Sequence, residues 1–530
     1  MQNRSAPSKI SRQPVIQATI ILTVTAVASH ILGLVRDMVI AQQFGASAQT
    51  DAYLVANIIP GVIMVLVATA ITGAFIPVFI DYRNKHGEKE AWHVASGLIN
   101  GILIFLLLST VFTVVAAPFI VPILAPGFDT GTMALAVMLT KAMSPAIVLL
   151  GMAALFTAIL HAYQHFTAPA FASLLYNVGI IAGVLLLAGR FGIAGLAVGV
   201  VIGAAGQMLA QIGVMAKKRQ YYSLTLDLFH PGVKKVGWLI LPLLVSSGVN
   251  QLNVIIDRFL ASGLAEGSIS ALNFAYVVMH LPWSIFATAV GTAIFPTLAE
   301  QAAESKLDLM RKTISEGVRT VWFLMVPAAM GMIVLRESIV RVLFERGAFD
   351  AVATGMTAGA LMFYAFGLIA FGGNVIMLRS FYSLQDTRTP TMIVIIMVVM
   401  KIVLSLALVD YMAQNGLALA TSLAATVSFL LLLFGLRRKL QSIDGRRLAV
   451  SLAKMIFASA VMGITIWIVS NLSQPFFQSP ASVWQQILQL GSLILLGIIV
   501  YSGMAALLRM EEFAKVVSLM YNAIGRIRKR

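Results

Sequence analysis

The stretch DAYLVANIIP at residues 51–60 and the stretch TAITGAFIPVF at residues 69–79 resemble two segments later in the chain. These read ALNFAYVVMHLP at residues 271–282 and TAVGTAIFPTL at residues 288–298, about 220 positions further on. Similar segments that recur in the same order and at the same spacing indicate a duplicated fold.

The composition places this duplication in a membrane. Of the 530 residues, 59% are hydrophobic and 11% are charged, and the mean hydropathy of +0.92 is far above that of a water-soluble domain. A bilayer core of about 30 Å requires about 20 apolar residues per helix. We expect fourteen such spans, at residues 15–42, 53–80, 92–117, 134–160, 168–189, 192–216, 237–261, 272–297, 317–335, 354–380, 391–411, 416–436, 448–471 and 484–508.

The Lys and Arg residues alternate between the two sides of these spans. Of the 37 in the chain, 28 fall on the side of the termini and 4 on the other side. Because loops rich in Lys and Arg stay in the cytoplasm, both termini are expected to be cytoplasmic. The formal charge of +16 therefore favours basic loops that face an anionic leaflet over nucleic-acid binding.

A second pair of segments supports the duplication. HAYQHFTAP at residues 161–169 and RSFYSLQDTRTP at residues 379–390 lie at a similar offset, and each ends at a Pro that enters the next span. We expect an all-α polytopic membrane protein with two parallel six-helix lobes around a central cavity, an architecture suited to alternating access, plus two C-terminal helices. The expected parts are a cytoplasmic tail (1–14), an N-lobe (15–216), a cytoplasmic linker (217–236), a C-lobe (237–440), the last two spans (441–508) and a basic cytoplasmic tail (509–530).

The sequence contains little that indicates catalysis or metal binding. It has no G-x-x-x-x-G-K-S/T run, no H-E-x-x-H and no Cys. The sequence therefore predicts a transporter and not an enzyme, with no metal and no organic cofactor.

Charged residues inside a predicted span are costly and require an explanation. The segment SHILGLVRDMVIAQQFGASAQTD, residues 29–51, contains His30, the adjacent pair Arg36 and Asp37, and Asp51. Neighbouring side chains on a helix point about 100° apart, so we expect Arg36 and Asp37 not to neutralise each other directly. Each then needs another partner or water, and two hypotheses stay open: an interhelical salt bridge, or the wall of a polar cavity.

The second half repeats this theme. Asp257 and Arg258 are adjacent in its first span, which favours a site on the axis that relates the two halves. Lys141 and Lys401 lie in apolar spans without an acidic residue nearby, and Lys401 lies far from either end of its span. We predict that Lys401 pairs with Asp257 in the place of a bound ion. Intramembrane Asn residues, Asn177 among them, either line a cavity or, as we expect for any single one, bond helices together.

Several motifs together resemble the MurJ/MviN lipid II flippase family, within the superfamily that includes multidrug efflux and oligosaccharide-lipid exporters. They are ILGLVRD, FGAS, TDAY, AFIPVF, LLYNVGIIAG, EGSISALNFAY, FPTLAE, LFERGAFD and SFYSLQDTRTP, and the resemblance runs from about residue 15 to 440. It implies transport of the lipid-linked peptidoglycan precursor from the inner to the outer leaflet of the bacterial cytoplasmic membrane. Alternating access would be coupled to a monovalent cation gradient or to the membrane potential. The implied roles are peptidoglycan biosynthesis, cell-wall biogenesis and cell shape, with membrane lipids and cell-wall synthesis proteins as partners.

The resemblance also implies where the substrate binds. In the family, a cationic cavity in the first half holds the pyrophosphate and headgroup, and the last two helices flank a groove for the lipid tail. Arg36, Asp37 and Asp51 fall on positions of the family motif.

The chain departs from the family at several of its cations. His30 stands where the family has Arg, the segment GVIMVLVATAITG at residues 61–73 has no charge, and Val277 stands where an Arg is frequent. Arg36 is therefore expected to be the main cation of the cavity, with Lys141 and Arg258 as substitutes. The alternatives are an exporter of another polyprenyl-linked oligosaccharide or of an amphipathic small molecule, and a membrane scaffold that does not transport.

Overall fold

The computed structural model describes residues 15–473 and 482–514, and every regular element in those ranges is helical. The expected tail at residues 1–14 and residues 515–530 of the expected basic tail lie outside these ranges. The chain divides into two compact units between Ser270 and Ala271. This division follows packing contacts and does not define the parts that move in transport. The expected limits of the N-lobe (15–216) and the C-lobe (237–440) therefore stay predictions.

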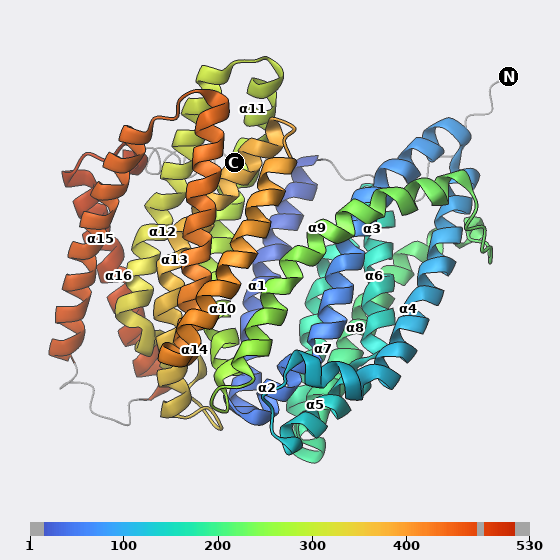
Figure 1. The fold of residues 1–530 in the computed structure, drawn as a ribbon, viewed down its shortest axis with the longest axis horizontal. Helices are drawn as coiled ribbons and strands as arrows, with labels where there is room; N and C mark the ends of the chain where they lie inside the picture. Colours follow the sequence, from blue (N-terminus) through green and yellow to red (C-terminus); the bar gives the residue numbers. More distant parts are fainter. Residues whose placement is uncertain (1–14, 474–481, 515–530) are drawn as a thin grey trace, which may run out of the picture. The chain divides into compact units, whose positions relative to one another are not determined.

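The first unit is drawn from blue to green in Figure 1. Helix α3 packs against α6 and α9, α1 packs against α7, and α6 packs against α8. Its described helices are α1 (Val15–Phe44), α2 (Ala48–Ala56), α3 (Ile58–His86), α4 (Glu88–Leu124), α5 (Thr130–Met143), α6 (Pro145–Ala162), α7 (Thr167–Phe191), α8 (Ile193–Met215), the 3₁₀ helix η1 (Ala216–Tyr221) and α9 (Pro231–Ala261).

The second unit has longer helices. Helix α12 packs against α13 and α15, and α13 packs against α14. The described elements are α10 (Ser268–Pro282), the π-helix η2 (Trp283–Ala287), α11 (Thr288–Ala303), α12 (Leu307–Phe344), α13 (Ala351–Ser383), α14 (Arg388–Leu440), α15 (Gly445–Ser473) and α16 (Val483–Leu507).

The fourteen expected spans are confirmed as helices, with differences in continuity. Twelve helical segments of the described residues are long and apolar enough to cross a membrane. The 53 residues of α14 would extend about 80 Å as one helix, far more than a bilayer core of about 30 Å, and α14 contains a non-helical residue at Ala413. Counting its two parts separately and adding α9, which has 31 residues, gives fourteen.

Three expected spans are interrupted in the structure. The span at 53–80 is divided between α2 and α3 at Asn57, and the span at 134–160 is divided between α5 and α6 at Ser144. Pro145 then begins α6, where its missing N–H leaves no hydrogen bond unmade. The span at 272–297 contains the π-helix η2. Hydropathy alone does not reveal such breaks, because the residues on both sides are apolar.

The local geometry of the two halves confirms the repeat. Gly192, between α7 and α8, has φ 55° and ψ −140°, and Ala413, 221 positions later, has φ 48° and ψ −132°. Gln164 and Gln385, again 221 positions apart, both have positive φ, at 59° and 57°. The amide that follows each Gln donates to the carbonyl five residues earlier, at 2.9 and 3.0 Å. Each half therefore reverses its chain with the same two turns.

Glycines bring α7 and α8 into unusually close contact. A Cβ atom on Gly179 would lie 2.3 Å from the Cα of Gly203, and one on Gly183 would lie 2.4 Å from the Cα of Gly199. Only Gly permits this approach, which replaces lipid contacts by close backbone packing between the two helices.

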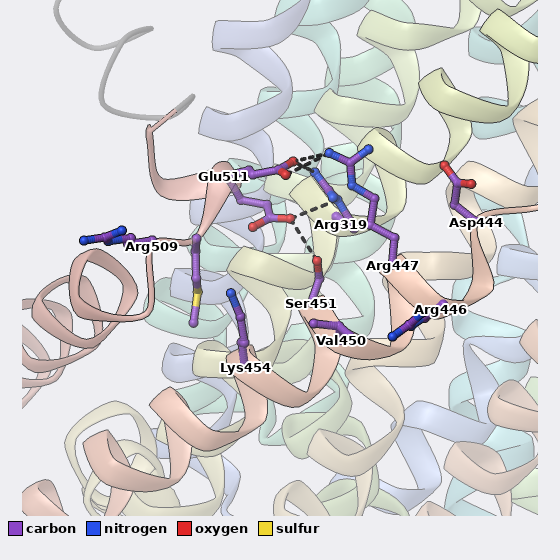
Figure 2. Close-up of a pocket in the computed structure, with 11 residues that line it drawn as sticks. Arg319, Asp444, Arg446, Arg447, Val450, Ser451, Lys454, Arg509 and Glu511 are labelled. Carbon is purple, nitrogen blue, oxygen red and sulfur yellow. Dashed lines mark hydrogen bonds and ion pairs between the residues drawn. The ribbon is translucent and has the colours of Figure 1, made fainter.

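An ion-pair network joins the last two helices to α12. Arg319 of α12 contacts Glu511 and Glu512, which follow α16, at 2.9 Å each. Arg447 of α15 contacts Glu511 at 2.7 Å, and Ser451 donates to Glu512. Figure 2 shows these groups along a cavity of about 480 Å³.

The network also sets the acidity of Glu511. Hydrogen bonds from Arg447 and Arg319 lower the pKa of Glu511 from its ordinary 4.5 to about 2. Because this pKa is lowered by folding, the pairs stabilise the protein above pH 4.5, and the stabilisation is lost as the pH falls towards 2.

The first prediction concerns orientation, and it uses exposed positions in a chain without native Cys. Ala265→Cys and Tyr411→Cys should react with a membrane-impermeant maleimide added to intact cells. Ser305→Cys and Ser442→Cys should react only after permeabilisation, because the basic side is expected to be cytoplasmic. The reverse labelling pattern would refute this orientation.

The second prediction concerns the network around Arg319. Arg319→Met leaves the buried Glu512 without its cation, which should lower the free energy of unfolding by about 3–5 kcal/mol. Arg319→Met combined with Glu512→Gln should recover most of that loss. Arg447→Met, which removes an exposed partner, is the control and should cost less than about 1 kcal/mol. Equal unfolding midpoints in detergent for Arg319→Met and the unchanged chain would show that the network does not stabilise the fold.

Candidate substrate site

Arg36 lies on α1 and makes three polar contacts with described residues. Its Nε donates to Oδ1 of Asp37 at 2.9 Å, and a terminal nitrogen lies 2.8 Å from the same oxygen. The other terminal nitrogen donates to Oδ1 of Asn177 on α7 at 3.2 Å. The Arg36 side chain keeps 25% of its surface exposed, whereas that of Asp37 keeps 5%. The guanidinium is thus shared between its neighbour on α1 and a second helix.

The contact between Arg36 and Asp37 corrects the expectation that adjacent residues could not neutralise each other. The Cα–Cβ bonds do diverge along a helix, but the Arg side chain is long enough to turn its planar group back over the neighbouring carboxylate. The expected additional partner of Arg36 is also present, because Asn177 bonds α7 to α1. The salt bridge lies within α1 and is therefore not the interhelical salt bridge of the first hypothesis, because the contact between helices is the hydrogen bond to Asn177. The cavity wall stays a prediction.

The surroundings of the pair are polar and largely buried. Oδ2 of Asp37 is buried and has no hydrogen-bond partner among the described residues. The Tyr53 ring of α2 and the Tyr176 ring of α7 lie within electrostatic range of Arg36. Asn177 in turn donates to the carbonyl of Ser173 at 3.3 Å. The site accordingly carries a partly exposed Arg side chain and a carboxylate whose second oxygen has no hydrogen-bond partner among the described residues.

Asp51 and Arg258 come together at a different place, the turn between α9 and α10. Asp51 is 4% exposed and accepts hydrogen bonds from the backbone N–H of Gly267 at 2.9 Å and of Ser270 at 2.7 Å. The Ser270 hydroxyl also donates to Asp51, and Arg258 donates to the carbonyl of Ile269 at 3.0 Å. These contacts connect α2 to the start of α10. Asp51 therefore has a structural role at this turn.

Of the remaining predicted site residues, His30 shares α1 with Arg36, and the others belong to other elements. Lys141 is exposed on the last turn of α5, where a cation is favoured by the helix dipole. His30 is exposed on α1. Lys401 of α14 is 3% exposed, and Asp257 of α9 is half-buried. Lys401 and Asp257 belong to different compact units, so their predicted pairing stays a prediction.

The sequence did not predict that Tyr53 and Tyr176 lie near Arg36, or that Gly267 and Ser270 bind Asp51. Their signal in the sequence is weak, since they are recognised only by what the fold places beside Arg36 and Asp51. Asn177 was considered for either a cavity wall or a bond between helices, and the structure shows the bond.

Comparisons with known proteins agree on one family. The family described as lipid II flippase MurJ matches residues 40–485. A "Lipid II flippase MurJ" of Burkholderia cenocepacia is 30% identical over 420 residues, covering 78% of this chain and 81% of that protein. A "Probable lipid II flippase MurJ" of Haemophilus influenzae is 31% identical over 507 residues, covering 91% and 98%.

Solved structures agree with the sequence relatives. A lipid II flippase MurJ in an inward closed conformation aligns with a TM-score of 0.78 and 26% identity, over 92% of this chain and 98% of that one. An inward-facing MATE family multidrug resistance transporter of the MOP superfamily aligns with a TM-score of 0.69 and 14% identity, over 80% and 98%, which shows a shared fold. The chain belongs to the MurJ lipid II flippase family.

Proposed function

We propose that this protein moves lipid II from the inner to the outer leaflet of the bacterial inner membrane by alternating access, without chemical conversion of the substrate. Family membership over residues 40–485 is the observation that carries the proposal. The repeated turns at Gly192 and Ala413 support it, because duplicated halves are the usual framework of alternating access. Cell-wall synthesis proteins are the partners that this function implies.

Arg36 is the residue that we propose to contact the pyrophosphate of the substrate. A guanidinium has five N–H donors in a plane and binds phosphate oxygens in pairs. In the structure Asp37 takes two of its nitrogens, so the pair has no net charge. A pyrophosphate that binds here competes with Asp37 for Arg36, and this competition makes release of the substrate easier than release from an unpaired cation.

A second candidate substrate is another polyprenyl-linked oligosaccharide. The observation that favours it is the absence of charge from residues 61–73 together with Val277, where the family has additional cations. A headgroup with fewer negative charges needs fewer cations in a medium of low dielectric constant.

Lys401 is proposed to replace a bound coupling ion. Its ammonium is attached to α14 and is buried at 3% exposure, so it cannot leave as an external ion does. A fixed cation favours one conformation of a transporter regardless of the sodium concentration. We therefore propose coupling to the membrane potential and not to a sodium gradient.

The third prediction tests function and site together. The unchanged chain should support growth of cells depleted of their own lipid II flippase. Arg36→Met should not, and it should also be less stable because Asp37 stays buried without its cation. Arg36→Met combined with Asp37→Asn should restore stability but not growth, whereas Arg36→Lys should restore part of the growth because a point charge replaces a planar group.

The outcomes of this experiment separate the alternatives. Growth with the double variant would exclude Arg36 as the substrate cation. No growth with the unchanged, correctly inserted chain would exclude lipid II, and restored export of a different lipid-linked oligosaccharide would then establish the second candidate. Arg437→Met, at an exposed position of α14, is the matched control and should support normal growth.

The fourth prediction concerns coupling. Transport into reconstituted vesicles should proceed at the same rate when sodium is replaced by choline. Lys401→Met should slow transport, and Asp257→Asn in the same chain should restore it, because removing one partner of a pair leaves the other charge buried. A strict sodium requirement would contradict the proposal.

A further inference from the structure

The segment between α8 and α9, residues 216–230, is called the linker strap here. It is drawn in green in Figure 1 and joins the six N-terminal spans to the rest of the chain. It is bound along α4 by hydrogen bonds: the Tyr222 hydroxyl donates to Oδ1 of Asn100 at 2.6 Å, and Nδ2 of Asn100 donates to the carbonyl of Thr225 at 2.8 Å. The backbone N–H of Ser223 donates to the Ser96 hydroxyl at 3.1 Å. The strap is therefore held in place and is not a loose tether.

Small residues of α4 make room for the linker strap. A Cβ atom on Gly101 would lie 2.8 Å from Cδ2 of Leu228, and one on Gly97 would lie 3.4 Å from the carbonyl oxygen of Asp227. An ion pair between Lys218 and Glu88, the first residue of α4, adds to the attachment. One side of the linker strap is thus covered by α4.

The other side of the linker strap carries large apolar side chains without protein cover. Leu224 is 92% exposed, Phe229 is 81% exposed and Leu226 is 54% exposed. Trp238, two turns into α9, is 75% exposed. The surfaces of soluble proteins rarely expose several large apolar side chains together. Trp is enriched at the interface between membrane and water.

The position of the linker strap on α4 places these side chains near the membrane surface. The strap binds α4 at Ser96 and Asn100. The exposed large apolar residues of α4 begin with Ile104 and Phe105, which are 41% and 59% exposed. At 1.5 Å per residue, Asn100 and Ile104 are about 6 Å apart along the helix axis. The strap therefore binds α4 near the cytoplasmic end of the expected span at 92–117, about one helical turn before the first exposed apolar side chains.

Positive charge surrounds the exposed apolar side chains. Residues 216–235 contain five basic residues and one acidic residue, Asp227. Two of the five are paired with acidic residues of α4 and α3, Lys218 with Glu88 and Lys235 with Asp81. The ammonium of Lys234 lies 5.2 Å from the centre of the Phe229 ring. Apolar side chains flanked by Lys and Arg match a leaflet that contains anionic phospholipid.

We infer that the linker strap is an interfacial membrane anchor, with Leu224, Phe229 and Trp238 inserted among the headgroups of an anionic leaflet. This leaflet lies on the side of the basic loops. It is the leaflet from which the proposed substrate is taken. The anchor holds the segment that connects the first six spans to the rest of the chain at a fixed depth in the membrane interface. It does not depend on the identity of the transported lipid.

Single Cys residues test the anchor directly, because the chain has none of its own. Leu224→Cys and Phe229→Cys are labelled in detergent with a polarity-sensitive dye and reconstituted into vesicles of phosphatidylcholine and phosphatidylglycerol. Asn84→Cys, exposed near the end of α3, is the control on the aqueous side. Lipids brominated on their acyl chains should quench the dye at positions 224 and 229 at least twofold more than at position 84, and iodide should show the opposite order.

Each other result overturns the inference. Iodide quenching at 224 and 229 equal to that at 84 would place the strap in water. Protection from both quenchers would show that a protein surface, from a second copy or another partner, covers it. Bromolipid quenching that does not fall when phosphatidylcholine replaces the phosphatidylglycerol would remove the requirement for anionic lipid.

Discussion

Hydrocarbon offers no hydrogen bonds, so a polar group of this chain that enters the membrane is costly unless it finds a partner within the protein. The backbone meets this constraint by forming helices, which is why the described ranges contain helices as their only regular elements. The side chains meet it by pairing: Arg36 with Asp37 and Asn177, Asp51 with the amides of Gly267 and Ser270. Pairing thus sets where helices begin, turn and touch.

The same constraint shapes the proposed transport site. A cation without a partner would bind an anionic headgroup tightly but would be costly in the empty protein. Pairing Arg36 with a carboxylate lowers that cost, while the exposed quarter of the Arg36 side chain stays open to a ligand. The paired Arg36 therefore binds an anionic headgroup less tightly than an unpaired cation would, and it releases the headgroup more easily. Easy release suits a protein that must let go of its substrate in each transport cycle. At the other end of the chain, the pairs around Arg319 and Glu512 fasten α15 and α16 to α12 without any comparable exposure of Arg319.

Much of the fold could be predicted because membrane thickness and turn geometry leave short-range signals. Apolar runs of about 20 residues marked the spans, and the Lys and Arg bias separated the two sides. The duplication was visible in residues 51–60 and 271–282, and the turns at Gly192 and Ala413 repeat it in three dimensions. Ala413 stands where the first half has Gly192, and because Ala disfavours positive φ, this turn could not be predicted from the residue type.

The candidate site could be predicted only in part. Arg36 and Asp37 stood out as charges in an apolar span, but their direct contact depends on a side-chain conformation that helix geometry does not specify. Asp51 was predicted for the cavity, and its contacts with residues more than 200 positions away tie it to the α9–α10 turn. Arg319 and Glu511, 192 positions apart, carried no shared signal in the sequence.

Transbilayer movement of lipid II by the purified protein is the most direct measurement of the central claim. Vesicles would contain fluorescent lipid II in both leaflets, and a membrane-impermeant reductant would destroy only the label that reaches the outer leaflet. The account predicts that the unchanged chain exposes nearly all of the label, and that the chain carrying Arg36→Met and Asp37→Asn exposes no more than protein-free vesicles do. Equal exposure of the label by both proteins, or none by the unchanged chain across an imposed membrane potential, would contradict it.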